Sequence, residues 1–188
     1  MTCIVGLVND GVVWIGGDSL AGDTSTYVVS SRKDPKVFIH GGEFLIGYTS
    51  SFRMGQIIRY HFIPPKIVVS DLYWYMVTKF VKELRVKLLE EGFSTKENNR
   101  ELGGEFLVGI RGRLFGIHSD FQVSEAREGY TAVGSGYQLA LGSLHNKGVL
   151  LSPRRRVLSA LRAAEAHSAY VRRPFVVKHV GTPGIPGR

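Results

Sequence analysis

The chain has 188 residues, one cysteine and a formal net charge of +8, which predicts one domain with a substantial hydrophobic core. No run of eighteen apolar residues occurs and no basic, apolar leader opens the chain, so we expect neither a membrane span nor a secretory signal. Cys3 alone allows no intrachain disulfide and no cysteine-built metal site. We therefore expect a cytoplasmic protein without a metal or cofactor.

Basic residues are concentrated in the C-terminal third, at 154–156, 162, 172–173 and 178. A basic surface of this kind could contact nucleic acid or another acidic partner. No aromatic-interleaved RNA-binding motif or zinc finger accompanies the charge, and a solvated helix face explains it as well. Nucleic acid is therefore not among the expected partners.

The first eighteen residues predict a tight hairpin. Two apolar runs, 4–8 and 12–15, flank Asn9-Asp10-Gly11, and such a turn between short β-branched runs is typical of paired antiparallel strands. The hairpin folds back on itself, so we expect Asp18, just after the second strand, to lie near Thr2 at the start of the first.

Thr2 follows the initiator Met, and aminopeptidases generally remove Met when the next residue is small. Removal would leave a hydroxyl and a free α-amine on one residue. A threonine hydroxyl needs a base beside it to act as a nucleophile, and an α-amine has a reference pKa of about 7.7–8.0. Taken alone, Thr2 is better explained as a β-branched residue that opens a strand, and the nucleophile interpretation depends on the rest of the chain.

The residues after the hairpin alternate between short strands and helices. A turn-rich loop is expected at 19–26, followed by strands at 27–31, 37–39 and 44–48. A helix with Ser51 as its N-cap is predicted over 50–59, before Pro64-Pro65. Apolar residues recur every four positions over 71–91, which predicts a long helix. A polar loop is expected at 93–104.

In the second half of the chain, predicted strands are again followed by predicted helices. Strands are predicted at 105–110, 114–118, 122–124 and 130–133, then a Gly134-Ser135-Gly136 turn and a helix over 137–144. Ser152-Pro153 opens the last long helix, and 175–180 is the final strand. The pattern predicts an α+β fold of two stacked antiparallel sheets with helices outside, forming a single domain over 1–180 with a flexible Gly/Pro-rich tail at 181–188.

Several short motifs, taken in their order along the chain, resemble those of proteasome β-subunits and the bacterial HslV, members of the N-terminal nucleophile (Ntn) hydrolases. Residues 2–6 resemble the family's threonine-initiated first strand, and 17–19 its Gly-Asp or Asp-Ser motif after the first hairpin. Lys36-Val37 resembles its lysine that opens a strand, and 134–136 its Gly-Ser-Gly turn. Gly47 falls where the family uses a backbone N–H as an oxyanion donor.

The resemblance implies a four-layer αββα sandwich and assigns a role to each of these residues. Thr2 Oγ1 would attack a peptide carbonyl, with its own α-amine carrying the proton. Lys36 would hold a positive charge beside them and change their pKa values, and Asp18 would fix Lys36. The Gly47 N–H would stabilise the oxyanion, and Ser135 would orient the amine.

Three further residues are candidates for accessory roles. Lys33 is a rival for the role of Lys36, but it precedes Asp34-Pro35 rather than a strand. In the family, the last long helix often ends with an aspartate, and a serine follows three residues later. Glu165 and Ser168 have this spacing, with a glutamate at the position of the aspartate. Another alignment places Ala166 at the position of the acid.

The resemblance thus implies a threonine-type peptide-bond hydrolase acting in a self-compartmentalising homo-oligomeric ring. Its substrate would be a peptide or an unfolded protein, and an ATP-dependent unfoldase would be a partner. The absence of a long segment before Thr2 matches the HslV type. Two alternatives remain open, a catalytically inactive structural or assembly protein with the same fold and an Ntn amidase for a small substrate.

Overall fold

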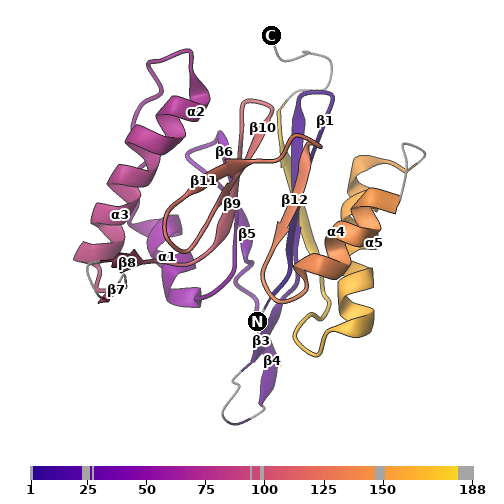
Figure 1. Cartoon of the computed structure of the whole chain (residues 1–188). Coiled ribbons are helices and arrows are strands. Elements are labelled where there is room, and N and C mark those ends of the chain that lie inside the picture. The colour runs from indigo at the N-terminus through magenta and orange to yellow at the C-terminus, as the bar shows by residue number, and fades with distance from the viewer. Residues whose placement is uncertain are drawn as a thin grey trace.

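A computed structural model describes residues 2–22, 26, 28–93, 95–97, 100–146 and 151–181. Two antiparallel sheets lie at its centre, with helices on their outer sides (Figure 1). The four-stranded sheet has the order β12-β1-β2-β13 and the five-stranded sheet the order β11-β10-β9-β6-β5. The prediction of a fold that combines antiparallel sheets with helices is therefore confirmed.

The strands of each sheet come from both halves of the chain. The four-stranded sheet contains β1 (Ile4–Asn9), β2 (Val12–Gly17), β12 (Tyr130–Val133) and β13 (Val176–Val180). The five-stranded sheet contains β5 (Val37–His40), β6 (Phe44–Tyr48), β9 (Phe106–Ile110), β10 (Arg113–Ile117) and β11 (Val123–Glu125).

The first hairpin forms as expected from its turn residues. Asn9 pairs with Val12 across the turn, and both intervening residues have positive φ, +49° at Asp10 and +74° at Gly11. A two-residue turn of this kind matches the twist of the paired strands. The register continues to Ile4 opposite Gly17, which brings the chain just after β2 beside the start of β1.

Helices from two parts of the chain cover the sheets. The helices are α1 (Phe52–Tyr60), α2 (Leu72–Tyr75), the π-helical turn η1 (Met76–Phe80), α3 (Val81–Glu90), α4 (Tyr137–Asn146) and α5 (Pro153–His167). Ser51 caps α1 by accepting from the Arg53 and Met54 N–H groups, as predicted. Elements α2, η1 and α3 follow one another without a break and replace the single α-helix expected over 71–91.

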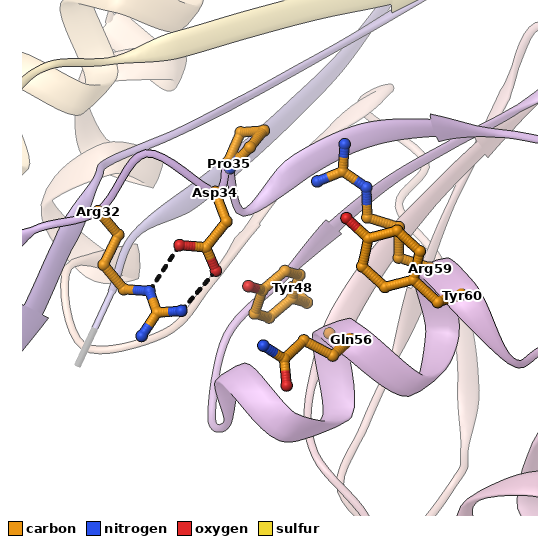
Figure 2. Close-up of a pocket in the computed structure, with 8 residues that line it drawn as sticks. Arg32, Asp34, Pro35, Tyr48, Gln56, Arg59 and Tyr60 are labelled. Atoms are coloured by element: carbon orange, nitrogen blue, oxygen red, sulfur yellow. Dashed lines mark hydrogen bonds and ion pairs between the residues drawn. The ribbon is translucent and has the colours of Figure 1, made fainter.

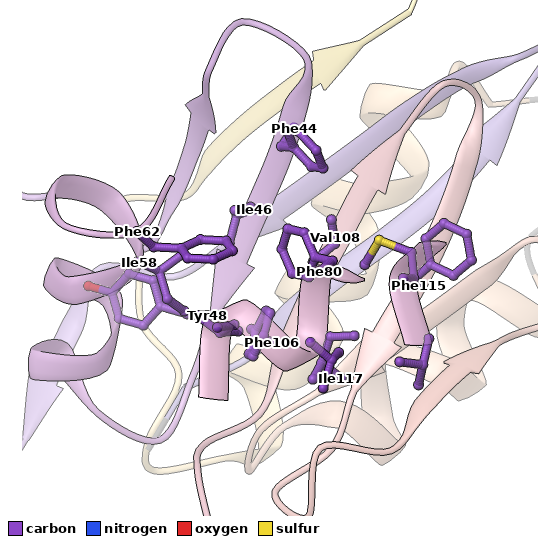
Figure 3. Close-up of a cluster of buried hydrophobic side chains, with 14 of the residues drawn as sticks. Phe44, Ile46, Tyr48, Ile58, Phe62, Phe80, Phe106, Val108, Phe115 and Ile117 are labelled. Atoms are coloured by element: carbon purple, nitrogen blue, oxygen red, sulfur yellow. The ribbon is translucent and has the colours of Figure 1, made fainter. Parts of the chain in front are cut away.

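Three clusters of buried side chains hold these elements together. The first joins the five-stranded sheet to α1, α2, η1 and α3 and is rich in aromatic rings, among them Phe44, Phe80 and Phe106 (Figure 3). The second joins the four-stranded sheet to α4 and α5. The third lies between the sheets and includes Ile4 and Leu107. The first two clusters thus connect the sheets to helices, and the third connects the sheets to each other.

Two segments expected to be loops contain strands. The segment 19–26 contains β3 (Leu20–Gly22), which pairs with β4 (Val29–Ser31) after it. The segment 93–104 contains β7 (Thr95–Glu97) and β8 (Arg100–Leu102), which pair with each other. The loop predictions were wrong there because these three-residue strands pair locally and carry no long alternation of apolar residues.

Several predictions fall partly outside the described residues, including the loops expected at 19–26 and 93–104, in which 23–25, 94 and 98–99 are not described. Tyr27, the first residue of the strand expected at 27–31, is not among the described residues, and neither is 182–188 of the expected tail. In the part of the chain that is described, no helix combines the length and apolar character needed to cross a bilayer.

Candidate active site

The first hairpin brings Thr2 and Asp18 together in the interior. Thr2 is 4% exposed and Asp18 is 1% exposed. The Asp18 carboxylate accepts a hydrogen bond from the Cys3 N–H at 3.0 Å and a second from the Leu20 N–H at 3.0 Å. Two backbone donors on either side of the hairpin therefore fix the position of this buried carboxylate.

Lys36 enters the same group from the loop before β5. Its side chain is 2% exposed, and its Nζ donates to Asp18 at 3.1 and 3.2 Å and to the Leu20 carbonyl at 2.6 Å. The same Nζ lies 2.7 Å from Thr2 Oγ1. The Lys36 carbonyl accepts from the Tyr48 N–H at 3.1 Å, so the backbone that carries this lysine is anchored to β6.

Burial governs the ionisation of this group. Loss of hydration lowers the pKa of Lys36, and the nearby Asp18 carboxylate opposes that shift. The Cys3 thiol beside them has its pKa raised to about 12, mainly by burial and secondly by the charge of Asp18. Cys3 is thus a protonated, unreactive core residue at neutral pH.

Ser135 holds the backbone of Thr2 from the turn between β12 and α4. The Thr2 nitrogen donates to Ser135 Oγ at 3.2 Å, and that hydroxyl donates to the Thr2 carbonyl at 3.2 Å. The same carbonyl accepts from the Gly136 N–H at 3.4 Å. Gly134 has a φ of +91°, and a Cβ there would overlap the Thr2 carbonyl oxygen, so this turn needs glycine.

Gly47 lies in the sheet and not among the residues around Thr2, which corrects the oxyanion role expected for it. It sits within β6, opposite Val37 on one side and Leu107 on the other. A Cβ at Gly47 would lie 2.6 Å from a methyl group of Ile4 and 2.7 Å from one of Ile15. This glycine therefore allows the sheets to approach each other, and its N–H belongs to the sheet rather than to the surroundings of Thr2.

A small cavity of about 90 Å³ opens beside Thr2 Oγ1, and the turn between β6 and α1 forms one wall. Ser50 in this wall has a φ of +68°. Its side chain accepts from the Glu105 N–H at 3.0 Å, while its own N–H has no hydrogen-bond partner among the described residues. The sequence did not indicate Ser50, because a left-handed serine has no sequence signature.

The accessory candidates lie outside this group of contacts. Glu165 forms an ion pair with the Arg173 guanidinium at 2.7 Å and accepts from the Arg173 N–H at 3.0 Å. Ser168, the C-cap of α5, accepts from the Tyr170 N–H at 3.3 Å. Lys33 is exposed. Lys36, and not Lys33, is the lysine that contacts Thr2.

The sequence matches no protein-family model and no curated protein. Its structure, however, superposes on BPH of Thiobacillus denitrificans with a TM-score of 0.76 at 18% identity, covering 95% of this chain and 97% of BPH. This is the fold of the proteasome-like Ntn hydrolases.

Two other Ntn hydrolases of this type share the fold. HslV from Trypanosoma brucei matches with a TM-score of 0.66 at 15% identity, over 94% of this chain and 98% of that protein. A Gly-1 mutant of Anbu from Hyphomicrobium sp. strain MC1 matches with a TM-score of 0.66 at 14% identity, over 94% and 80%. The Ntn-hydrolase resemblance expected from the sequence is confirmed at the level of the fold.

Proposed function

We propose that the chain is a threonine-type peptide-bond hydrolase whose nucleophile is Thr2 after removal of Met1. The observation that carries the proposal is the 2.7 Å contact between Lys36 Nζ and Thr2 Oγ1, within a group that Asp18 holds. A buried cation beside a hydroxyl stabilises the alkoxide and lowers the pKa of that hydroxyl.

The proposed reaction uses two groups of one residue. Thr2 Oγ1 attacks the carbonyl carbon and its proton passes to the neutral α-amine, which forms the tetrahedral intermediate. The C–N bond then breaks, the ammonium of Thr2 returns the proton to the leaving amine, and an ester remains on Oγ1. Water adds to the ester with the amine again as base, which releases the acid and regenerates Thr2.

Two supporting roles follow from the contacts. The Ser50 N–H, rather than that of Gly47, is the proposed oxyanion donor, because Ser50 lines the cavity beside Thr2 and its N–H has no hydrogen-bond partner in the described part of the chain. A donor of this kind contributes about 3–4 kcal/mol to the transition state. Ser135 orients the α-amine, since its Oγ already lies 3.2 Å from the Thr2 nitrogen.

A peptide or an unfolded protein is the proposed substrate. The cavity at Thr2 continues into an open groove of about 460 Å³ that shares Gly22 and Phe52 with it. The β3–β4 ribbon forms part of this groove beside the N-terminus (Figure 1). An extended chain fits such a groove better than a compact molecule does, which favours a peptidase over an amidase for a small substrate.

The wider proposal keeps what the resemblance implied. It comprises a single domain over 1–180, a four-layer αββα sandwich, a homo-oligomeric ring in the cytoplasm and an ATP-dependent unfoldase as partner. The Thiobacillus BPH structure has also been described in complex with epoxomicin, and that complex matches this chain with a TM-score of 0.73 at 19% identity. We therefore choose epoxomicin as a probe.

Three measurements on the purified protein test the proposal. Intact mass spectrometry should show loss of Met1, a fluorogenic peptide should be hydrolysed, and epoxomicin should add to Thr2. Thr2→Ala should abolish hydrolysis and labelling while the fold persists. Thr78→Ala, which removes a threonine hydroxyl bonded to the Trp74 carbonyl at 2.8 Å on the outer helices, should change neither.

Retention of Met1, or labelling that persists in Thr2→Ala, would reject Thr2 as the nucleophile. A parent protein that forms a ring but hydrolyses no peptide or amide would favour the inactive assembly protein. Gel filtration with multi-angle light scattering supplies the oligomeric state.

A further inference from the structure

A second cavity, of about 140 Å³ (Figure 2), shares part of its wall with the cavity at Thr2. Tyr48 lines both cavities. The Phe52 ring connects them as well, since Arg32 Cζ lies 4.2 Å and Lys36 Nζ 5.6 Å from its centroid. The second cavity has room for several water-sized groups, and its shared wall with the cavity at Thr2 makes it a candidate for the side chain of a substrate residue bound to Thr2.

The charges around the second cavity do not cancel. Arg32 and Asp34 form a two-point ion pair, with both hydrogen bonds at 2.7 Å (Figure 2), and this partner lowers the pKa of Asp34. Arg59, on α1, stacks on Phe38 at 5.2 Å. Arg59 has no carboxylate partner among the described residues. One negative and two positive side chains leave a net charge of +1.

Hydrogen-bond donors add to this positive character. Tyr48 is 4% exposed, and its ring packs on Gly55, where a Cβ would overlap it. Burial raises the pKa of Tyr48 to about 12, so the hydroxyl remains a neutral donor at physiological pH. Gln56 contributes a side-chain amide to the same wall.

We propose that this cavity receives the side chain on the acyl side of the cleaved bond and selects a carboxylate, so that the enzyme cleaves after glutamate in preference to lysine. The inference rests on the proposed function. Arg59 is the group that would pair with the substrate, because the Arg32 guanidinium is already engaged with Asp34. A charge-assisted bond to guanidinium favours the acid, and like charge disfavours lysine.

Acetylated peptides that differ only in this residue (Glu, Gln or Lys before aminomethylcoumarin) measure the selectivity of the full-length protein. We expect kcat/KM for Glu to exceed that for Lys by about tenfold or more. Arg59→Gln should reduce this ratio about tenfold. Asp34→Asn should raise it, because Arg32 would then lack its partner. Rates with the Gln peptide separate selectivity from any general loss of activity.

Arg53→Gln is the matched control, because Arg53 lies on the same helix but pairs with Glu91 at 3.1 Å. It should leave the Glu-to-Lys ratio unchanged. A ratio near or below one in the parent, or a ratio that Arg59→Gln does not change, would overturn the inference. Thermal melting of each variant shows whether it is folded.

A binding measurement keeps this inference separate from the proposed function. Thr2→Ala should bind an acetylated peptide acid ending in Glu more tightly than one ending in Lys, by isothermal titration calorimetry. Glu-selective binding without hydrolysis by the parent would contradict the hydrolase and support the assignment of the cavity to an acidic side chain. Equal binding of both peptides, or of neither, would overturn the cavity assignment even if the parent hydrolyses peptides.

Discussion

Lys36 Nζ donates to Thr2 Oγ1 at 2.7 Å although 34 positions separate the two residues in the chain. The contact exists because Asp18 accepts from the same Nζ and is itself fixed by the Cys3 and Leu20 N–H groups. The β1–β2 hairpin and the loop before β5 thereby meet at one atom. Catalysis and stability should both depend on this meeting point.

Replacing Lys36 by Met should abolish hydrolysis and destabilise the fold by about 3–5 kcal/mol, because Asp18 would remain buried without its cation. Urea unfolding and peptide hydrolysis measure the two effects. Lys33→Met is the control, since Lys33 is exposed three residues earlier, and should change neither. Similar effects of both substitutions would contradict the assignment of Lys36.

Removing both charges should recover stability without activity. In Asp18→Asn/Lys36→Met the buried charge that Lys36→Met leaves behind is gone, so the double variant should unfold at a higher urea concentration than the single one. Hydrolysis should remain absent. A double variant less stable than Lys36→Met would show that the pair contributes through packing rather than charge.

Gly134→Ala should destabilise the protein by about 2–4 kcal/mol and displace Thr2, because a Cβ at a φ of +91° would overlap the Thr2 carbonyl. Labelling of Thr2 by epoxomicin should decrease because Thr2 is displaced. Gly142→Ala provides the contrast, since Gly142 lies in α4 with open space around its Cβ position. That change should stabilise the fold by about 0.5–1 kcal/mol and leave labelling intact.

The two candidate oxyanion positions predict different phenotypes. Gly47→Ala should mainly lower stability, by about 1–3 kcal/mol, because the new methyl group meets Ile4 and Ile15. Ser50→Gly keeps the N–H and accepts a φ of +68° without strain, so kcat should remain within about threefold of the parent. Ser50→Val, which disfavours that φ, should reduce kcat strongly; full activity of the valine variant would argue against the Ser50 N–H as the donor.

Cys3 should resist alkylation in the folded protein. With its pKa raised to about 12 from an ordinary 9.0, its thiolate fraction at pH 8 is about a thousandfold lower than in the unfolded chain. Because the folded pKa is the higher one, this group's contribution to stability is complete below pH 9 and is lost as the pH rises towards 12. Iodoacetamide labelling with and without urea checks the first effect, and Cys3→Ala should weaken the second.

Local patterns in the sequence determined much of the architecture. Asn9-Asp10-Gly11 predicted the first hairpin, Ser51 the start of α1, and Ser152-Pro153 the start of α5, because turns and caps depend on neighbouring residues alone. The order of short motifs predicted that Thr2, Asp18, Lys36 and Ser135 belong together, and the structure brings these four into contact.

Tertiary structure decided what depends on contacts between distant segments. Gly47 carries the same sequence signature whether its N–H faces a substrate or pairs in a sheet, and only the packing of Ile4 and Ile15 against it separates the two. The positive φ of Ser50 and the partner of Glu165 likewise depend on residues far away in the chain. The physical reason is that backbone direction and charge pairing are set by the elements that pack around a residue, and these contacts arise only when the sheets and helices assemble.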